Sequence, residues 1–317
     1  MKVFITQKLP GNCESLLMKK GIVTETYKSD DIISKSYLIK KIKNVDALIC
    51  LLTNKIDKEV IDNMSSCKVI SNVAVGFNNI DIEYAKLKKI VVTNTPGILT
   101  DTTADLAVSL ILACARRIAE SDQFMRARKF KKWMPQLMLG LDLKGKTVGI
   151  IGAGRIGQEV AARLKSFKTK IIYSSITRKL DFEKNLGSIK VSLNYLMRNS
   201  DYITVHVPFN KSTFHLLNKQ NLTLMKKDAV IVNTSRGEVI EETALIELLK
   251  NKKIFAAGLD VYENEPNINP ELLKLKNIIL LPHIGSATIE TRSKMSFLAA
   301  KNVISVLKNG KAINPVN

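Results

Sequence analysis

The chain has 317 residues, of which 45% are hydrophobic, and this length predicts two domains rather than one compact core. The formal net charge is +20, but the basic residues are scattered along the whole chain, which favours a solvated lysine-rich surface over a nucleic-acid interface. The N-terminal apolar run is too short for a signal peptide, and the most apolar segment, 104–115, is too short to span a membrane. The four cysteines lie far apart, which predicts reduced thiols, no zinc or other metal site and a cytoplasmic protein.

Short β-branched runs alternate with helical patterns over the first hundred residues. Strands are expected at 3–6, 22–27, 47–53, 68–75 and 90–95, with helices near 12–20 and 79–88. This alternation predicts a parallel sheet with helices on both faces. A long apolar helix over 102–119 should follow, capped by Thr100 or Asp101, and then a basic, irregular stretch that holds Trp133.

A second series of strands begins after Gly145. Apolar runs predict strands at 147–152, 170–174, 203–208, 229–235, 255–261 and 278–282, with helices at 155–167 and 288–307. We therefore predict an α/β fold with two doubly wound parallel-sheet domains. Residues 1–98 plus 287–317 would form the substrate-binding domain, and residues 99–286 an inserted Rossmann dinucleotide-binding domain.

The segment Gly152-Ala153-Gly154-Arg155-Ile156-Gly157 fits the G-x-G-x-x-G pattern, directly after a predicted strand and at the start of a predicted helix. In that context Gly152 permits the tight turn, Gly154 lets a pyrophosphate approach the backbone, and Gly157 lets helix and strand pack closely. The helix N-terminus favours the negative charge of the diphosphate.

The end of the next strand predicts the cofactor. An NAD site usually has an acidic residue there for the ribose hydroxyls, whereas this chain has Ser174, Ser175, Thr177 and Arg178. Hydroxyls and a guanidinium suit a 2′-phosphate, so we expect NADPH to be preferred, with NADH possible.

Three charged residues follow predicted strands of the second domain: Arg236, Glu265 and His283. Open α/β sheets bind their ligands at this edge. Reduction of a 2-oxo acid needs a cation for the carboxylate, which a guanidinium provides, and a proton donor, which a histidine provides near neutral pH. A carboxylate beside the imidazole would orient it and favour its protonated form. The other histidines, His206 and His215, could equally be structural, and the residues alone do not choose His283 over them.

The chain resembles the D-isomer-specific 2-hydroxyacid dehydrogenase family, and most closely its glyoxylate/hydroxypyruvate reductase branch. The segments that carry the resemblance are VAVGFNNID (73–81), VTNTPGILTDTTADLA (92–107), VGIIGAGRIGQ (148–158), HVP (206–208), LMKKDAVIVNTSRGEVI (224–240), GLDVYENEP (258–266) and LPHIGSAT (281–288). The resemblance implies that Arg236 binds the substrate carboxylate and that His283 is the proton donor. It selects Glu265 over Glu263 as the partner of His283, because the family's carboxylate directly precedes a proline.

Other positions take their roles from the same resemblance. Backbone amides of Val75 and Gly76 would bind the substrate carboxylate, and Asp260 would bind the nicotinamide carboxamide. Ile176 stands where these reductases often have arginine, so one usual contact to NADPH is missing. The segment WMPQLMLG (133–140), which begins at Trp133, resembles a reductase segment that reaches a neighbouring subunit's site, which implies a homodimer. The remaining predicted cofactor contacts are Thr103, His206, Val207, Pro208, Thr213, Thr234, Ser235 and Gly285, together with Arg236 and His283.

Two alternatives remain open. One is a short-type phosphoglycerate dehydrogenase, although Leu52 lies where a phosphate-binding arginine would be expected, and an aliphatic wall there favours a small substrate. The other is a non-catalytic scaffold that senses NAD(H), because the fold alone does not establish catalysis. No nucleic-acid or membrane partner is expected.

Overall fold

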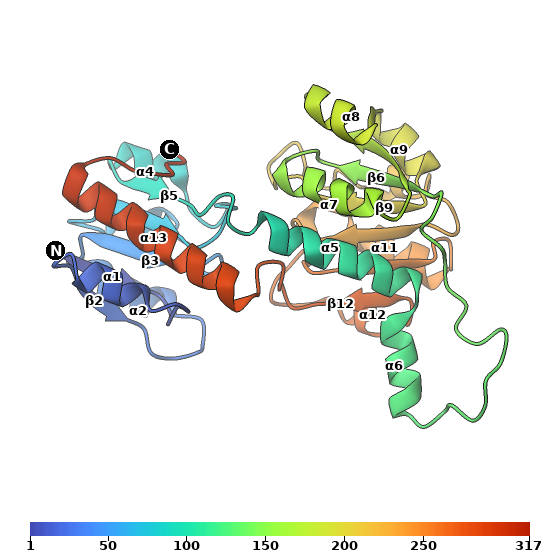
Figure 1. The fold of residues 1–317 in the computed structure, drawn as a ribbon. Coiled ribbons are helices and arrows are strands. Elements are labelled where there is room, and N and C mark those ends of the chain that lie inside the picture. The colour runs from blue at the N-terminus through green and yellow to red at the C-terminus, as the bar shows by residue number, and fades with distance from the viewer. The chain divides into compact units, whose positions relative to one another are not determined.

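The computed structural model describes residues 1–317 and confirms the predicted fold class (Figure 1). The chain divides into two compact units, Met1–Leu99 with Ser286–Asn317, and Thr100–Gly285. These bounds differ by one residue from those expected for the two domains. Each unit is a fully parallel sheet with helices on both faces.

The first unit has five strands in the order β2-β1-β3-β4-β5. On one face, buried side chains of α1 and α13 form a core with β1 and β3, and on the other face α2, α3 and α4 form a second core. Figure 1 shows the long α13 lying across this sheet. The strands are β1 (Lys2–Ile5), β2 (Val23–Thr26), β3 (Ala47–Cys50), β4 (Val69–Asn72) and β5 (Val91–Thr93), and the helices are α1 (Cys13–Met18), α2 (Lys35–Ile42), α3 (Lys58–Asp62), α4 (Ile82–Leu87) and α13 (Ile289–Asn309).

The end of the chain is hydrogen-bonded to the edge strand of the first unit. The N–H of Val316 donates to the carbonyl of Val92 at 2.9 Å. Asn302 of α13 donates to the carbonyl of Asn94 at 3.1 Å and accepts the N–H of Asn314 at 3.0 Å. These bonds fix α13 and the final residues against β5, so both parts of the sequence form one unit.

The second unit has seven strands in the order β12-β11-β10-β9-β6-β7-β8. Helices α5, α7 and α8 cover one face, and α9, α10, α11 and α12 cover the other. The strands are β6 (Thr147–Ile151), β7 (Lys170–Ser174), β8 (Ile189–Lys190), β9 (Tyr202–Val205), β10 (Val230–Asn233), β11 (Ala256–Leu259) and β12 (Ile278–Leu280), and the helices are α5 (Thr100–Ala115), α6 (Ile118–Arg126), α7 (Arg155–Lys165), α8 (Leu180–Leu186), α9 (Leu193–Asn199), α10 (Lys219–Leu222), α11 (Glu242–Lys250) and α12 (Pro270–Leu273).

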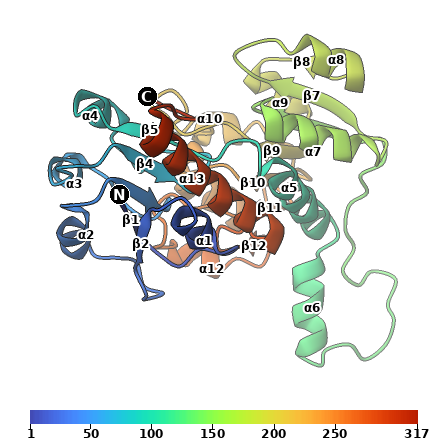
Figure 2. The ribbon, with the colours of Figure 1, turned by 60° about the vertical axis from the view of Figure 1, so that its left-hand side comes forward.

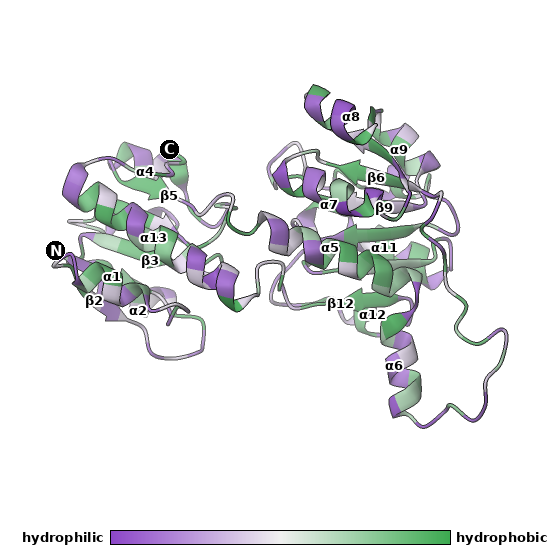
Figure 3. Ribbon diagram, in the orientation of Figure 1, coloured by the Kyte–Doolittle hydropathy of each residue, from purple (hydrophilic) through white to green (hydrophobic).

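Hydropathy follows this layering. Figure 3 shows largely hydrophobic strands in both sheets, whereas the helices alternate between hydrophobic and hydrophilic residues along their length. Near-continuous apolar strands are what a parallel sheet covered on both faces requires. No helix is long and apolar enough to cross a lipid bilayer.

The helix expected over 102–119 is two helices in the structure. Helix α5 ends at Ala115, and Arg117 adopts a left-handed conformation with φ of 52° before α6 begins. The carbonyl of Ala115 accepts the N–H of Leu141 at 2.8 Å, and a Cβ on Gly140 would lie 2.3 Å from that carbonyl oxygen. The returning chain therefore occupies the space in which α5 would continue.

Helix α6 and the segment after it project from the rest of the second unit in both views (Figures 1 and 2). Several apolar side chains on this projection are exposed, and the Trp133 side chain is 78% exposed. The irregular stretch predicted around Trp133 is present, but its first part, α6, is helical.

Candidate functional site

The glycine-rich turn has the backbone that a dinucleotide loop requires. Gly152 follows β6 with φ of 95°, and a Cβ on it would lie 2.7 Å from the backbone of His206. A Cβ on Gly157 would lie 2.2 Å from the carbonyl oxygen of Gly152, so helix and turn touch at this point. Gly154 caps α7, and a Cβ on it would meet nothing within 4 Å. Open space therefore lies beside the N-terminus of α7, where Arg155 and Ile156 form the first turn.

An acidic residue that sequence analysis missed, Glu183 of α8, lies against the side chain of Tyr173 in β7. Arg178 donates to both carboxylate oxygens of Glu183, through Nε at 3.1 and 2.9 Å. The hydroxyl of Tyr173 donates to the same carboxylate at 2.8 Å. Ser174 and Ser175 are half-buried, Thr177 is exposed, and Ile176 is 95% exposed. Glu183 lies too far along the chain to belong to the strand-end pattern, and only the fold of α8 returns it to β7.

The loop after β10 places Arg236. Asn233, the last residue of β10, accepts the N–H and the hydroxyl of Ser235 at 2.9 and 2.8 Å and donates to the carbonyl of Arg236 at 2.8 Å. Burial lowers the pKa of Arg236, while the charges of Glu265 and Glu238 oppose that shift. A guanidinium stays protonated in proteins, so Arg236 is a half-buried cation in this loop.

His283 and Glu265 form a hydrogen-bonded pair. Nδ1 of His283 lies 2.7 Å from Oε2 of Glu265, and the other oxygen of Glu265 accepts the N–H of Tyr262 at 3.0 Å. Burial raises the pKa of Glu265, but the hydrogen bond and charge of His283 and the charge of Arg236 bring it below its ordinary value of 4.5. The three residues that the sequence selected are thus electrostatically coupled, and Glu265 is an anion at neutral pH.

Asp260 holds the backbone of the loop that carries His283. Its two carboxylate oxygens accept the N–H groups of Ile284 and Gly285, each at 2.7 Å. The hydroxyl of Thr103 donates to the carbonyl of Gly285 at 3.0 Å. His283 itself has φ of 54°, a left-handed conformation that these bonds stabilise. Each oxygen of Asp260 has one protein donor, and a carboxylate oxygen can accept a second bond.

The segment after β9 contains the other predicted cofactor residues. Burial lowers the pKa of His206 to about 3, and its Nε2 lies 2.8 Å from the hydroxyl of Thr204, so this ring is neutral and is no acid at pH 7. Val207 lies against the glycine turn. Thr213 closes its own loop by donating to the carbonyl of Pro208 at 2.7 Å. The hydroxyl of Thr234, after β10, is buried without a hydrogen-bond partner in the protein.

In the first unit, the loop after β4 exposes two backbone N–H groups. Val75 and Gly76 are half-buried, and their N–H groups have no acceptor within the protein. Their carbonyls accept the side-chain amides of Asn94 and Asn72 at 2.8 and 2.9 Å, which fixes the loop. Two adjacent N–H groups held in this way can bind an anion. Leu52 lies in the loop after β3 and is 37% exposed.

Comparison of the chain with known proteins identifies its family. The family described as "D-isomer specific 2-hydroxyacid dehydrogenase, NAD binding domain" matches residues 108–285. A glyoxylate reductase of Thermococcus litoralis is 49% identical, over all of this chain and 96% of that protein. The chain belongs to the D-isomer specific 2-hydroxyacid dehydrogenase family.

Solved structures resemble this D-2-hydroxyacid dehydrogenase family member along its whole length. An NADPH-dependent glyoxylate/hydroxypyruvate reductase from Sinorhizobium meliloti, in complex with NADP and malonate, is 31% identical with a TM-score of 0.86, covering 99% of this chain and 96% of that one. A D-lactate dehydrogenase from Aquifex aeolicus, complexed with NAD and lactic acid, is 26% identical with a TM-score of 0.87, covering 100% and 99%. The resemblance that the sequence motifs indicated is therefore confirmed.

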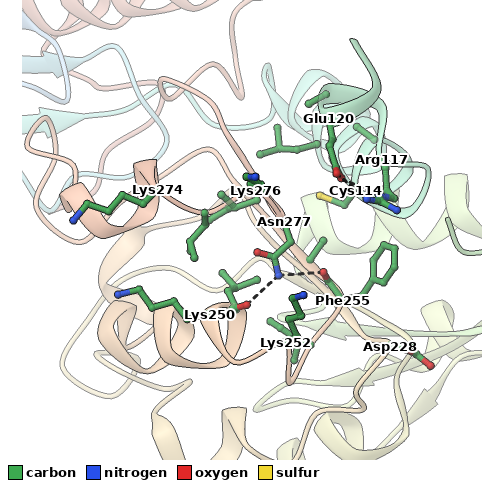
Figure 4. Close-up of a pocket in the computed structure, with 18 of the residues that line it drawn as sticks. Cys114, Arg117, Glu120, Asp228, Lys250, Lys252, Phe255, Lys274, Lys276 and Asn277 are labelled. Carbon is green, nitrogen blue, oxygen red and sulfur yellow. Dashed lines mark hydrogen bonds and ion pairs between the residues drawn. The ribbon is translucent and has the colours of Figure 1, made fainter. Parts of the chain in front are cut away.

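This family member also has a pocket of about 670 Å³ in the second unit, at the amino ends of β10, β11 and β12 (Figure 4). Its lining includes Phe255 and Asn277, which immediately precede β11 and β12, and Asp228, which lies two residues before β10. Asn277 donates to the carbonyls of Leu249 and Phe255 at 3.2 and 3.4 Å. Arg236, Glu265 and His283 follow the carboxyl ends of the same strands, so this pocket is separate from the loops that carry them.

Proposed function

We propose that the protein reduces a small 2-oxo acid, glyoxylate or hydroxypyruvate, to the D-2-hydroxy acid by hydride transfer from NAD(P)H. The observation that carries the proposal is the His283–Glu265 pair, which is coupled to the half-buried Arg236 in the unit that holds the glycine-rich turn. The Thermococcus litoralis and Sinorhizobium meliloti relatives named as glyoxylate reductases support this substrate class.

His283 would supply the proton. Because Nδ1 of His283 faces Glu265, Nε2 is the nitrogen left to donate to the carbonyl oxygen as negative charge develops on it. Glu265 remains ionised above its lowered pKa, so it stabilises the imidazolium and holds the ring in one orientation. His206 is unsuited to this role because its ring stays neutral.

Arg236 would bind the substrate carboxylate. A guanidinium offers two parallel donors to a carboxylate, and partial burial strengthens that interaction relative to water. In the first unit, the N–H groups of Val75 and Gly76 would be donors suited to a carboxylate, and the aliphatic Leu52 would suit a short side chain.

The residues present fit a nicotinamide dinucleotide. The open space at Gly154, the N-terminus of α7 and the unpartnered hydroxyl of Thr234 would hold it, and the cofactor supplies the hydride when bound. Ser174, Ser175, Thr177 and Arg178 would receive a 2′-phosphate, which supports NADPH over NADH. Thr103 of α5 and Asp260 both bond to Gly285, and Asp260 also bonds to Ile284, so the two residues would hold the loop that carries His283.

The experiment is a set of initial rates with a panel of 2-oxo acids, each with NADPH and with NADH. Turnover of glyoxylate or hydroxypyruvate that is lost in His283→Ala supports the proposal. Faster oxidation of D-3-phosphoglycerate than reduction of either acid would favour a phosphoglycerate dehydrogenase. Binding of NAD(H) without turnover of any acid would favour a scaffold that senses the cofactor.

We also propose that the projection formed by α6 and residues 127–139 serves a homodimer. Exposed apolar side chains on a projecting element are typical of an interface. The side chains of Phe130, Trp133 and Leu139 are 47%, 78% and 59% exposed. Light scattering at micromolar concentration should give twice the mass of the 35.3 kDa chain, and Trp133→Ala should weaken the association.

A further inference from the structure

A second histidine–glutamate pair lies beside the proposed catalytic one. Nε2 of His215 is 2.5 Å from Oε1 of Glu263, and both side chains are mostly buried, at 29% and 23% exposure. The ring of His215 stacks on Phe214, with centroids 4.0 Å apart and an interplanar angle of 16°. The proposed chemistry uses neither residue of this pair.

His215 joins the loops that follow three different strands. It lies in the segment after β9, and its backbone N–H donates at 2.9 Å to the carbonyl of Glu238, in the loop that carries Arg236. Its ring is bonded to Glu263, in the loop that carries Glu265. One residue therefore connects the segments on which Arg236 and Glu265 are placed.

The loops after β10 and β11 also touch directly. A Cβ on Gly237 would lie 1.9 Å from the carbonyl carbon of Tyr262 and 2.4 Å from the nitrogen of Glu263. The N–H of Glu263 donates to Glu242 at 3.3 Å. With so little space between the loops, a displacement of Glu263 moves the backbone that carries Glu265.

We propose that His215 is a positioning residue for the reaction. Through Glu263 it fixes the 262–266 loop, so that Glu265 meets Nδ1 of His283. This inference rests on the proposed function, in which the His283–Glu265 pair protonates the substrate. The charged groups around the two pairs are Glu242 near Glu263, Arg236 near Glu265, and Asp260 near both Glu265 and His283, with Glu238 near Arg236.

The backbone of His215 is consistent with a constrained position. Its φ is 46°, in the left-handed region that residues other than glycine adopt only with backbone strain. The ring bond to Glu263 and the backbone bond to Glu238 hold that conformation. Misplacement of a reacting group by about 1 Å can reduce a rate by up to about a hundredfold, so a small movement of Glu265 is measurable.

The test compares His215→Ala with His215→Gln, whose side-chain amide can donate to Glu263 in place of Nε2. The readouts are kcat, the pH dependence of kcat/KM for glyoxylate reduction with the faster cofactor, and the unfolding midpoint. We expect His215→Ala to lower kcat about tenfold and to move the alkaline limb to lower pH, and His215→Gln to restore most of both. Glu247→Gln, which breaks the exposed Lys219–Glu247 ion pair outside these loops, should change neither.

A double-mutant cycle separates this proposal from the proposed function. In the Glu265→Gln background, His215→Ala should move the alkaline limb no further, because the carboxylate on which His215 acts is gone. If Glu265→Gln moves the limb but His215→Ala lowers only the unfolding midpoint, His215 is merely structural and the positioning role is wrong. If His283→Ala remains active, the proposed function fails whatever His215 does.

Discussion

The guanidinium of Arg178 lies against the carboxylate of Glu183, with Nη2 2.8 Å from Oε2. The hydrogen bonds from Arg178 and then from Tyr173 hold the pKa of Glu183 below its usual value, so Glu183 is an anion at pH 7. An acid beside the proposed 2′-phosphate site would repel a phosphate unless a cation neutralised it. Arg178 therefore has two functions in this proposal, as a donor to the phosphate and as the counter-charge of Glu183.

Arg178→Ala should lower the ratio of kcat/KM with NADPH to that with NADH by about tenfold or more, because charge-assisted hydrogen bonds are worth about 1.5–3 kcal/mol. The loss should fall on NADPH, since NADH has no 2′-phosphate. Lys184→Ala, which removes an exposed cation from α8, the helix of Glu183, is the matched control and should leave the ratio unchanged. Equal rates with both cofactors in the wild type would contradict the preference for NADPH.

The glycine-rich turn offers a pair of substitutions with opposite expected effects. In Gly154→Ala the new methyl meets no protein atom, so the unfolding midpoint without cofactor should stay the same while NADPH binds more weakly. In Gly157→Ala the methyl would lie 2.2 Å from the carbonyl oxygen of Gly152, so the protein itself should be destabilised. Urea denaturation and a fluorescence titration with NADPH measure the two effects. Unchanged cofactor affinity in Gly154→Ala would place the pyrophosphate elsewhere.

Arg163 of α7 connects two turns of α5 to the dinucleotide-binding helix. It bonds to Asp101, Asp105 and Glu159 at 2.8, 2.6 and 2.7 Å, while its own side chain is 26% exposed. We expect Arg163→Ala to lower the free energy of unfolding by about 1 kcal/mol, since the three carboxylates are largely exposed. The loss should shrink in 1 M salt, whose Debye length is about 3 Å. Lys165→Ala, in the same helix without an ion pair, is the control, and an equal loss there would show that charge pairing at Arg163 is irrelevant.

The sequence predicted features that depend on local patterns. Apolar runs located the strands, the G-x-G-x-x-G spacing located the turn at Gly152, and strand ends located Arg236, Glu265 and His283. Features that depend on distant partners were missed. Helix α5 ends because Gly140 and Leu141 return to Ala115, and Glu183 reaches β7 only through the placement of α8. The Asn72 and Asn94 bonds that fix the Val75–Gly76 loop likewise join residues from separate strands.

Substitutions at Arg236 and His283 should affect the kinetics differently. His283→Ala removes the proton donor, and general acid catalysis contributes about 10²- to 10⁴-fold, so kcat for glyoxylate reduction should fall by that factor. Arg236→Ala should raise KM as well as lower kcat, because the guanidinium would bind the carboxylate in both the ground state and the transition state. Steady-state kinetics on both variants measure the difference. Near-normal turnover in His283→Ala would overturn the whole assignment.

Glu265→Gln tests the partnership with His283 through pH. The pKa of Glu265 is below 4.5 in the folded protein, so the carboxylate is ionised throughout the range from pH 5 upward and faces the imidazole as an anion. Replacing it with a neutral amide removes the negative charge that favours the imidazolium. Reduction requires the protonated ring, so activity should persist at low pH while the alkaline limb of kcat/KM moves to lower pH. The pH profile of glyoxylate reduction measures this shift, and an alkaline limb that stays where it is in the wild type would mean that Glu265 does not stabilise the protonated His283.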